Sequence, residues 1–238
     1  MTRPEAQGLL YVLGEPGASV SEEEFNVWYD KDHAPLRLKV PGFQTAARYR
    51  SSDGHQPTWL AIYDLDTPEI AYSDAYKALS TNAPQYEKEL IPKLEVLNRR
   101  IYRLVMSVSK PDSEVAGKGG ASKYLLCVEA VVPLEADEDY NKLYEEGHLQ
   151  DIVNVQGCAR GRVFKLESSV ELTGKSMEGA QQENVNRYVA IYEWDRDSYF
   201  DDPQLQAAAS TPRTQEVSAK VTLTFKKYVL HKEFTGKE

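Results

Sequence analysis

His33 and the residues just before it have the side-chain types that proton transfer requires. Tyr29 and Asp30 precede it in the stretch YDKDHAP, at one helical turn and at three residues from the imidazole. Pro35 predicts that this helix ends near His33, where the carbonyl-rich terminus and the aspartate both favour the imidazolium. A histidine that titrates near neutrality is suited to acid or base catalysis. The alternative interpretation is a structural histidine that caps its helix and hydrogen-bonds the following loop.

A second catalytic candidate, His148, lies in a weaker copy of this motif. Tyr144 precedes it by one turn and Glu145 replaces the aspartate, each 115 positions further along than in the first motif. Leu149 and Gln150 stand where the first motif has Ala-Pro, so His148 is the weaker candidate of the two. Each motif offers one histidine and one carboxylate, which are too few ligands for a metal site. We therefore expect no metal and no other cofactor.

The two motifs belong to an internal repeat that spans nearly the whole chain. The blocks WLAIYDLD and YVAIYEWD correspond at an offset of 129, so the second copy is longer between its histidine motif and this block. The additional residues fall within 167–187, a polar, glycine-bearing segment that suits a surface loop. Residues 109–123 are rich in Gly, Ser and Lys, as a linker should be. We predict a first repeat over 1–108 and a second, more divergent repeat over 124–238.

Each copy has the order of elements of a ferredoxin-like unit. In the first copy LLYVL is typical of a buried strand, and Ser21 and Glu24 have capping-box spacing at the start of a helix. FQTAARYR, TWLAIYDL and RIYRLVMSV read as strands, with helical stretches before the last one. The second copy repeats this β-α-β-β-α-β order. The predicted fold is α+β, with two tandem ferredoxin-like repeats whose sheets cover each other in one α/β barrel within the chain.

Aromatic and aliphatic residues alternate in the third strand of each copy. Trp59 and Tyr63 share one face in the first copy, and Tyr192 belongs to the same face in the second. We expect the aliphatic faces to meet the helices and the aromatic faces to point into the barrel. There, with Trp28, they could line a cavity for a flat apolar substrate. The alternative is that these side chains merely fill the barrel.

Charged residues inside strand patterns are further candidates for substrate binding. Arg160 and Arg162 point to the same face of the second strand of the second copy, and Arg48 lies in the first copy's strand. A buried arginine could hold a carboxylate or an enolate, although a solvated one near the barrel rim is commoner. Glu129, within the apolar stretch LLCVEAVV, is either paired, for instance with one of those arginines, or poised with a raised pKa.

The chain resembles dimeric α/β-barrel proteins, most closely the EthD-like branch, with the usual two subunits fused in tandem. The resemblance rests on the sequence HAPL, which begins at His33, followed by VPG, which ends at Gly42. It implies a cofactor-independent enzyme that uses histidine acid/base chemistry on an aromatic or polyketide-like substrate, of the decarboxylase, dehydratase or cyclase type. The alternative is a non-catalytic, stress-associated or ligand-binding barrel protein. A cofactor-free monooxygenase or a haem-binding protein is less favoured.

Composition limits the partners that we expect. The chain has 238 residues and a net charge of −9, which opposes binding to nucleic acid or to an anionic membrane surface. No apolar run approaches the length of a membrane span, and the two cysteines suit a reducing cytoplasm. We expect a cytoplasmic protein whose partner is a small-molecule substrate. Because the pseudo-dimer forms within one chain, we expect a monomer or a weak homodimer.

Overall fold

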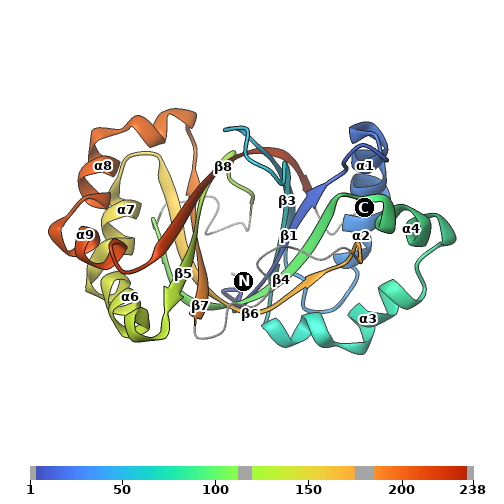
Figure 1. Cartoon of the computed structure of the whole chain (residues 1–238), viewed down its shortest axis with the longest axis horizontal. Coiled ribbons are helices and arrows are strands. Elements are labelled where there is room, and N and C mark those ends of the chain that lie inside the picture. The colour runs from blue at the N-terminus through green and yellow to red at the C-terminus, as the bar shows by residue number, and fades with distance from the viewer. Residues whose placement is uncertain (1–3, 112–119, 175–184, 235–238) are drawn as a thin grey trace.

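Strands from both halves of the chain form one closed antiparallel barrel (Figure 1). The computed structural model describes residues 4–111, 120–174 and 185–234. Around the barrel the strands of these residues follow the order β1-β3-β2-β8-β5-β7-β6-β4. Their bounds are β1 (Gly8–Glu15), β2 (Ala46–Ser51), β3 (Trp59–Leu65), β4 (Val96–Ser109), β5 (Tyr124–Pro133), β6 (Cys158–Glu171), β7 (Val185–Trp194) and β8 (Thr222–Phe234).

Helices cover the outer surface of the barrel on two opposite sides, with one set for each half of the chain (Figure 1). Ser21 accepts a hydrogen bond from the backbone N–H of Glu24 and begins the first helix, as the capping-box spacing predicts. The first set comprises α1 (Glu22–Trp28), η1 (Tyr29–His33), α2 (Ala34–Arg37), η2 (Pro68–Tyr72), α3 (Asp74–Thr81), α4 (Gln85–Leu90) and η3 (Ile91–Lys93). The second comprises η4 (Leu134–Ala136), α6 (Asp137–Leu143), η5 (Tyr144–His148), α7 (Leu149–Asn154), η6 (Asp197–Asp201), α8 (Pro203–Ala209) and α9 (Pro212–Ser218).

Each half arranges its strands in the same order. The first half has β4-β1-β3-β2 and the second has β8-β5-β7-β6. The halves meet where β2 pairs with β8 and where β4 pairs with β6, both antiparallel. The α+β class and the closure of the two sheets on each other confirm the coarse fold that the sequence predicts.

Side chains fill the barrel interior, and the aromatic faces of the third strands point away from it. Leu60 and Ile62 belong to the apolar cluster inside the barrel, together with Tyr11 from β1. Trp59 and Tyr63 pack instead with the helices of the first half. This corrects the prediction that the aromatic faces line the barrel. Alternation separates the two faces of a strand, but because both faces are buried here, hydrophobicity does not tell which one meets the helices.

The helical segment after β1 continues past His33. The π-helical turn η1 leads directly into α2, whose first turn contains Pro35. The N–H of Ala34 bonds to the carbonyl of Tyr29, and this π-helical turn directly before Pro35 accommodates a residue that has no N–H to donate. The predicted carbonyl-rich helix end beside His33 is therefore wrong.

The two predicted connections fall partly outside the described residues. Residues 112–119 of the predicted linker and 175–184 of the predicted surface loop are not among them. Of that loop, residues 167–171 continue β6 and 185–187 belong to β7. These residues pair with neighbouring strands, which corrects that part of the loop prediction.

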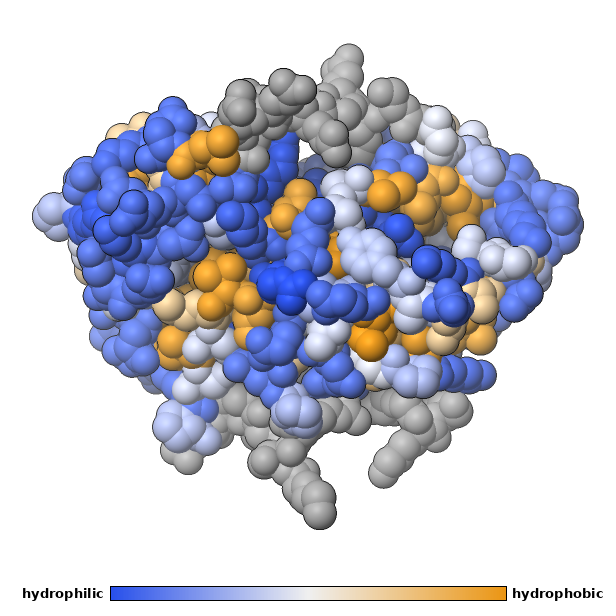
Figure 2. Space-filling model, turned by 90° about the horizontal axis from the view of Figure 1, so that it is seen from below, coloured by the Kyte–Doolittle hydropathy of each residue, from blue (hydrophilic) through white to orange (hydrophobic). Residues whose placement is uncertain are grey.

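The surface is mixed in character. Seen from below, hydrophilic residues separate several smaller apolar areas (Figure 2). In the described part of the chain no helix is both long enough and apolar enough to cross a membrane.

Candidate functional site

A cavity of about 220 Å³ lies between the helices and the sheet of the second half. Strands β5, β7 and β8 form its floor, and α6, η5, α7, α8 and α9 contribute its walls. Half of the lining residues are aliphatic, and none of the described residues that line it is Asp, Glu, Lys or Arg. Its polar groups include the side chains of His148, Thr214, Tyr140, Tyr144 and Tyr192. Such a cavity suits an uncharged, largely apolar molecule with a few hydrogen-bonding groups.

Two exposed phenylalanines stand beside this cavity. Phe200 of η6 is 37% exposed and Phe225 of β8 is 51% exposed, and both line it. Exposed aromatic side chains beside an apolar cavity provide a contact surface for a flat ligand that enters from solvent.

The tyrosines of the cavity form a connected group of hydroxyls. The hydroxyls of Tyr140 and Tyr144 are 3.3 Å apart, and Tyr144 also interacts with Tyr192. Burial raises the pKa of all three phenols, so they stay protonated at neutral pH. Their hydroxyls can therefore donate hydrogen bonds to a carbonyl or phenolate oxygen in the cavity.

His148 is held against the cavity by α9. Its Nδ1 atom lies 3.4 Å from the Oγ1 atom of Thr214, whose own backbone N–H is bound by Thr211. Burial lowers the pKa of His148 below its ordinary value of 6.5, an effect that Asp151 partly opposes. The imidazole is therefore neutral at pH 7 and can accept a proton. Gly147, at φ 119°, adopts the left-handed backbone of this turn, which a side chain would strain.

His33 has different surroundings. It is 4% exposed, packs against the rings of Trp28 and Tyr29 at 4.4 and 4.8 Å, and places Nδ1 3.3 Å from Glu87. Burial, aided by the charge of Arg37, lowers its pKa to about 3. Burial alone would raise the pKa of Glu87, but its contacts, with His33 first, hold it at about 2. The pair is thus a neutral imidazole beside a carboxylate, which corrects the expectation of an imidazolium.

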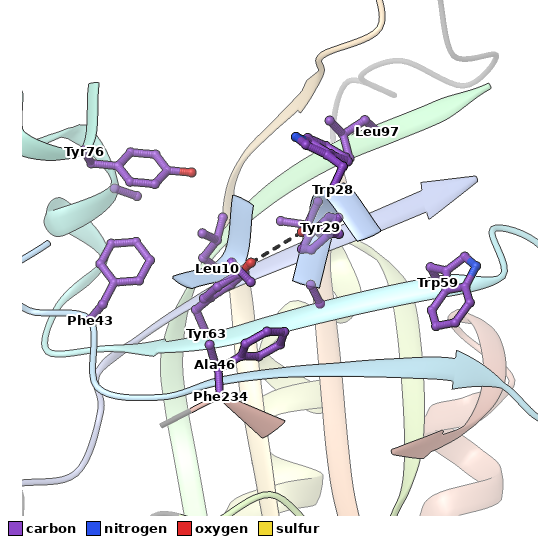
Figure 3. Packing of buried hydrophobic residues seen from close by; sticks show 14 of the residues in the cluster. Leu10, Trp28, Tyr29, Phe43, Ala46, Trp59, Tyr63, Tyr76, Leu97 and Phe234 are labelled. Carbon is purple, nitrogen blue, oxygen red and sulfur yellow. Dashed lines mark hydrogen bonds between the residues drawn. The ribbon is translucent and has the colours of Figure 1, made fainter. Parts of the chain in front are cut away.

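Larger side chains fill the space beside His33 in the first half. Trp28 occupies the position of Leu143, and its Nε1 donates to Glu87 at 2.9 Å. Tyr76 occupies the position of Leu205, since the N-caps of α3 and α8 correspond. Tyr76 stacks on Phe43 with ring centroids 5.5 Å apart, as the close-up of this core shows (Figure 3).

The other residues predicted around His33 form a structural cluster. Asp30 pairs with Arg48 and with His231, and forms no hydrogen bond or ion pair with His33. The guanidinium of Arg48 also lies 4.7 Å from the ring of Trp59.

Two tyrosines of the first half point toward each other between helix and strand. Tyr63 donates to the hydroxyl of Tyr29 at 3.5 Å, and Figure 3 shows this contact. Both residues are buried in the apolar cluster of the first half. The structure therefore brings Tyr29 and Tyr63 together but separates them from Tyr192, which lines the cavity of the second half.

The predicted binding residues on β6 form an ion cluster inside the barrel. Arg162, 2% exposed, pairs with Asp64 at 2.6 Å and with Glu193 at 3.0 Å. Arg160 pairs with the same Glu193 at 2.8 Å, so both arginines share a face as predicted. Their charges are already neutralised by protein carboxylates.

Glu129 is paired, but not with the predicted arginines. Arg100 lies 3.2 Å and Lys226 2.8 Å from its carboxylate, and Tyr11 donates to it at 3.3 Å. Burial alone would raise the pKa of Glu129, but Arg100 and Lys226 hold it below its ordinary value. A proton-transfer role based on a raised pKa is therefore wrong for Glu129.

Sequence reasoning missed Tyr140 and Thr214 as cavity residues. Tyr140, Tyr144 and His148 are spaced by four residues, so the helical period places them in one row and could have identified the first. Thr214 comes from α9, far away in the sequence, and no local pattern marks it. In the described part of the chain no group of three His, Cys, Asp or Glu side chains is placed to bind a metal ion.

No protein-family model matches the chain, and no curated protein matches it in sequence. Solved structures resemble it over nearly its whole length. An anthrone oxidase-like protein is 13% identical with a TM-score of 0.61, and the match covers 100% of this chain and 97% of that protein. Two proteins described as a "putative monooxygenase" follow. The protein from Fusobacterium nucleatum is 8% identical with a TM-score of 0.55, and the match covers 96% of this chain and 94% of that protein. The protein from Lactobacillus acidophilus is 11% identical with a TM-score of 0.54, and the match covers 98% of this chain and 97% of that protein. At these identities the likeness concerns the α+β barrel fold.

Proposed function

We propose that the chain is a small-molecule enzyme whose chemistry takes place in the cavity of the second half, with His148 as the general base. The observation that carries this proposal is a neutral imidazole on the wall of an apolar cavity, beside a group of tyrosine hydroxyls. His148 removes a proton from the substrate, and a tyrosine hydroxyl stabilises the negative charge that develops on an adjacent oxygen. This chemistry needs no electron transfer and no cofactor.

The cavity suggests a substrate of one or two rings. A cavity of about 150 Å³ holds benzene, and this one is about 220 Å³. Because none of the described lining residues carries a charge, a neutral phenol, enol or ketone fits better than a carboxylate. Among the reactions that the sequence suggests, dehydration or cyclisation of an aromatic or polyketide-like molecule is therefore favoured over decarboxylation.

A second candidate is oxygenation without a cofactor. It is favoured by the descriptions of the structural neighbours, an anthrone oxidase-like protein and two proteins called putative monooxygenases. Such a reaction would begin with the same removal of a proton from a phenol or an activated carbon. His148 would be required in both cases.

A non-catalytic ligand-binding protein is the alternative from another class. The packing of the barrel interior favours it, since side chains occupy that space and leave a pocket of about 20 Å³ there, which is too small for a substrate to react. In that case the cavity of the second half would bind a ligand, but replacing His148 would change no reaction.

The repeat itself is part of this proposal. We propose that the chain is a tandem duplicate whose halves have diverged, with repeats over 1–108 and 124–238. The equal strand order of the halves supports it, and so does the correspondence of His33 with His148. The EthD-like branch is proposed from the motif after His33. We expect the chain to act alone or as a weak homodimer.

A thermal-shift measurement tests whether the cavity binds such molecules. Naphthol should raise the melting temperature of the protein, whereas naphthoate, of similar size but charged, should not. The variant Leu143→Trp, which introduces the residue of the first half, should abolish the naphthol effect. Equal stabilisation of the wild type and of this variant would place the binding site elsewhere and contradict the proposal.

A further inference from the structure

The first half contains a separate cavity of about 200 Å³ among its helices. It lies between α2, α3 and the start of α4, and Leu36, Leu79 and Pro84 supply much of its apolar lining. Unlike the cavity of the second half, it has two charged residues on its wall, Arg37 and Glu87. A ligand that enters it therefore meets both apolar surface and charge.

Arg37 forms no direct ion pair with a carboxylate in the described part of the chain, although the charge of Glu87 acts on it. One terminal nitrogen of its guanidinium donates to the backbone carbonyl of His33, and the ring of Tyr76 lies 6.0 Å from its centre. No ion pair of the described residues includes it. A partly buried guanidinium retains several N–H donors, and these match the two oxygens of a carboxylate.

The second charged residue of this cavity, Glu87, has its carboxylate bound to residues of the core. Its Oε2 atom accepts from the Nε1 of Trp28 at 2.9 Å, and its Oε1 atom lies 3.3 Å from His33. The side chain is 9% exposed, so the carboxylate is held in place and its negative charge acts on the cavity. Glu87 repels any added negative charge, and this repulsion is larger for a dianion than for a monoanion, which Arg37 can pair with.

The corresponding positions of the second half are uncharged. Ile152 stands in the place of Arg37, and Thr214 in the place of Glu87, because the N-caps of α4 and α9 correspond. The charges are therefore specific to the cavity of the first half. The two halves present different chemistry to a ligand on equivalent faces of the fold.

We propose that this cavity is a second binding site that takes a small monocarboxylate with a short apolar body. The carboxylate pairs with the guanidinium of Arg37, and the apolar body packs against Leu36, Leu79 and Pro84. Glu87 selects against dianions by repulsion.

Titration of the isotope-labelled full-length protein with benzoate, followed by NMR, tests the proposal. The amide signals of Leu79 and Asn82 should shift in a saturable way with benzoate. The neutral, size-matched benzamide and the dianion phthalate should cause much smaller shifts. Because Leu143→Trp fills only the cavity of the second half, benzoate should bind this variant as it binds the wild type.

Two substitutions at the site should act in opposite directions. Arg37→Met should weaken benzoate binding by about tenfold or more, because it removes charge-assisted hydrogen bonds. Glu87→Gln should strengthen it several-fold, because the repulsion is lost while an oxygen remains for Trp28. Arg37→Lys, which keeps the charge, should bind with intermediate affinity and so guards against misfolding of the methionine variant. Equal binding of benzamide and benzoate, or benzoate shifts that survive in folded Arg37→Met, would overturn the proposal.

Discussion

The Nδ1 atom of His148 lies 3.4 Å from the Oγ1 atom of Thr214. The hydroxyl fixes one ring nitrogen without adding charge, so burial keeps the imidazole neutral. In the first half the equivalent contact joins His33 to the carboxylate of Glu87, which also accepts a hydrogen bond from Trp28. The same histidine position thus faces a cavity in one half and a filled core in the other.

The pH dependence of catalysis follows from the neutral imidazole. His148 acts as a base only when it is unprotonated, and its pKa lies below the ordinary 6.5. We therefore expect kcat/KM to be constant around pH 7 and to fall as the pH drops through a value below 6.5. Burial raises the pKa of Tyr144 and Tyr192, so no second decline should appear below the ordinary tyrosine value of 10. A profile that rises toward acid would show that His148 is not the base.

Exchanging Trp28 and Leu143, the equivalent residues of the two halves, should change the free energy of unfolding by unequal amounts. Trp28→Leu leaves a void and removes the N–H donor to Glu87. It should lower the free energy of unfolding by about 2–5 kcal/mol, as measured by urea denaturation. Leu143→Trp enters existing space and should cost much less. A comparable loss of stability in both variants would mean that the cavity at Leu143 is not open in solution.

The ion cluster inside the barrel predicts a large effect on stability. Arg162→Met removes the ion-pair partner of buried Asp64 and one of the two arginine partners of Glu193. It should lower the free energy of unfolding by about 3–5 kcal/mol. The matched control is Arg50→Met, which removes an exposed pair with Glu22 and should cost under about 1 kcal/mol. Chemical denaturation at neutral pH measures both. Similar costs for the two variants would contradict the burial of the cluster.

His33 should make the protein less stable in mild acid. Its pKa is about 3 in the folded state, against the ordinary 6.5 in the unfolded chain. As the pH falls through this interval the unfolded state binds the additional proton, so stability is lost. From about pH 7 to about pH 5 the wild type should lose about 2 kcal/mol more than His33→Gln. Parallel pH profiles for the two proteins would show that His33 is not buried in its neutral form.

The α+β class and the closed barrel were predictable, because local patterns indicate the order of strands and helices along the chain. Ser21 and Glu24 indicated the start of α1, and the repeated blocks indicated equivalent strands. The direction of strand faces was not predictable, since both faces of β3 are apolar and Trp59 could meet either layer. Residues distant in sequence determine that Trp59 packs against the helices of the first half.

The candidate site was predictable only in part. The histidine motifs identified His148, but the stronger motif at His33 led to a buried core. What separates the two is the size of side chains from other elements: Leu143 and Leu205 open the space that Trp28 and Tyr76 fill in the first half. Such size differences predict a cavity only when the positions of the helices on the sheet are known.

The most direct test of the proposed function is proton exchange on a surrogate substrate. β-Tetralone is a neutral two-ring ketone with an acidic C–H bond, and its hydrogen–deuterium exchange in heavy water can be followed by NMR. The wild-type protein should accelerate this exchange, and His148→Gln should reduce the acceleration by about 10²–10⁴-fold while naphthol still stabilises the variant against heating. His33→Gln should exchange β-tetralone as the wild type does. An acceleration that survives in His148→Gln, or that disappears in a folded His33→Gln protein, would contradict the assignment of the chemistry to the second half.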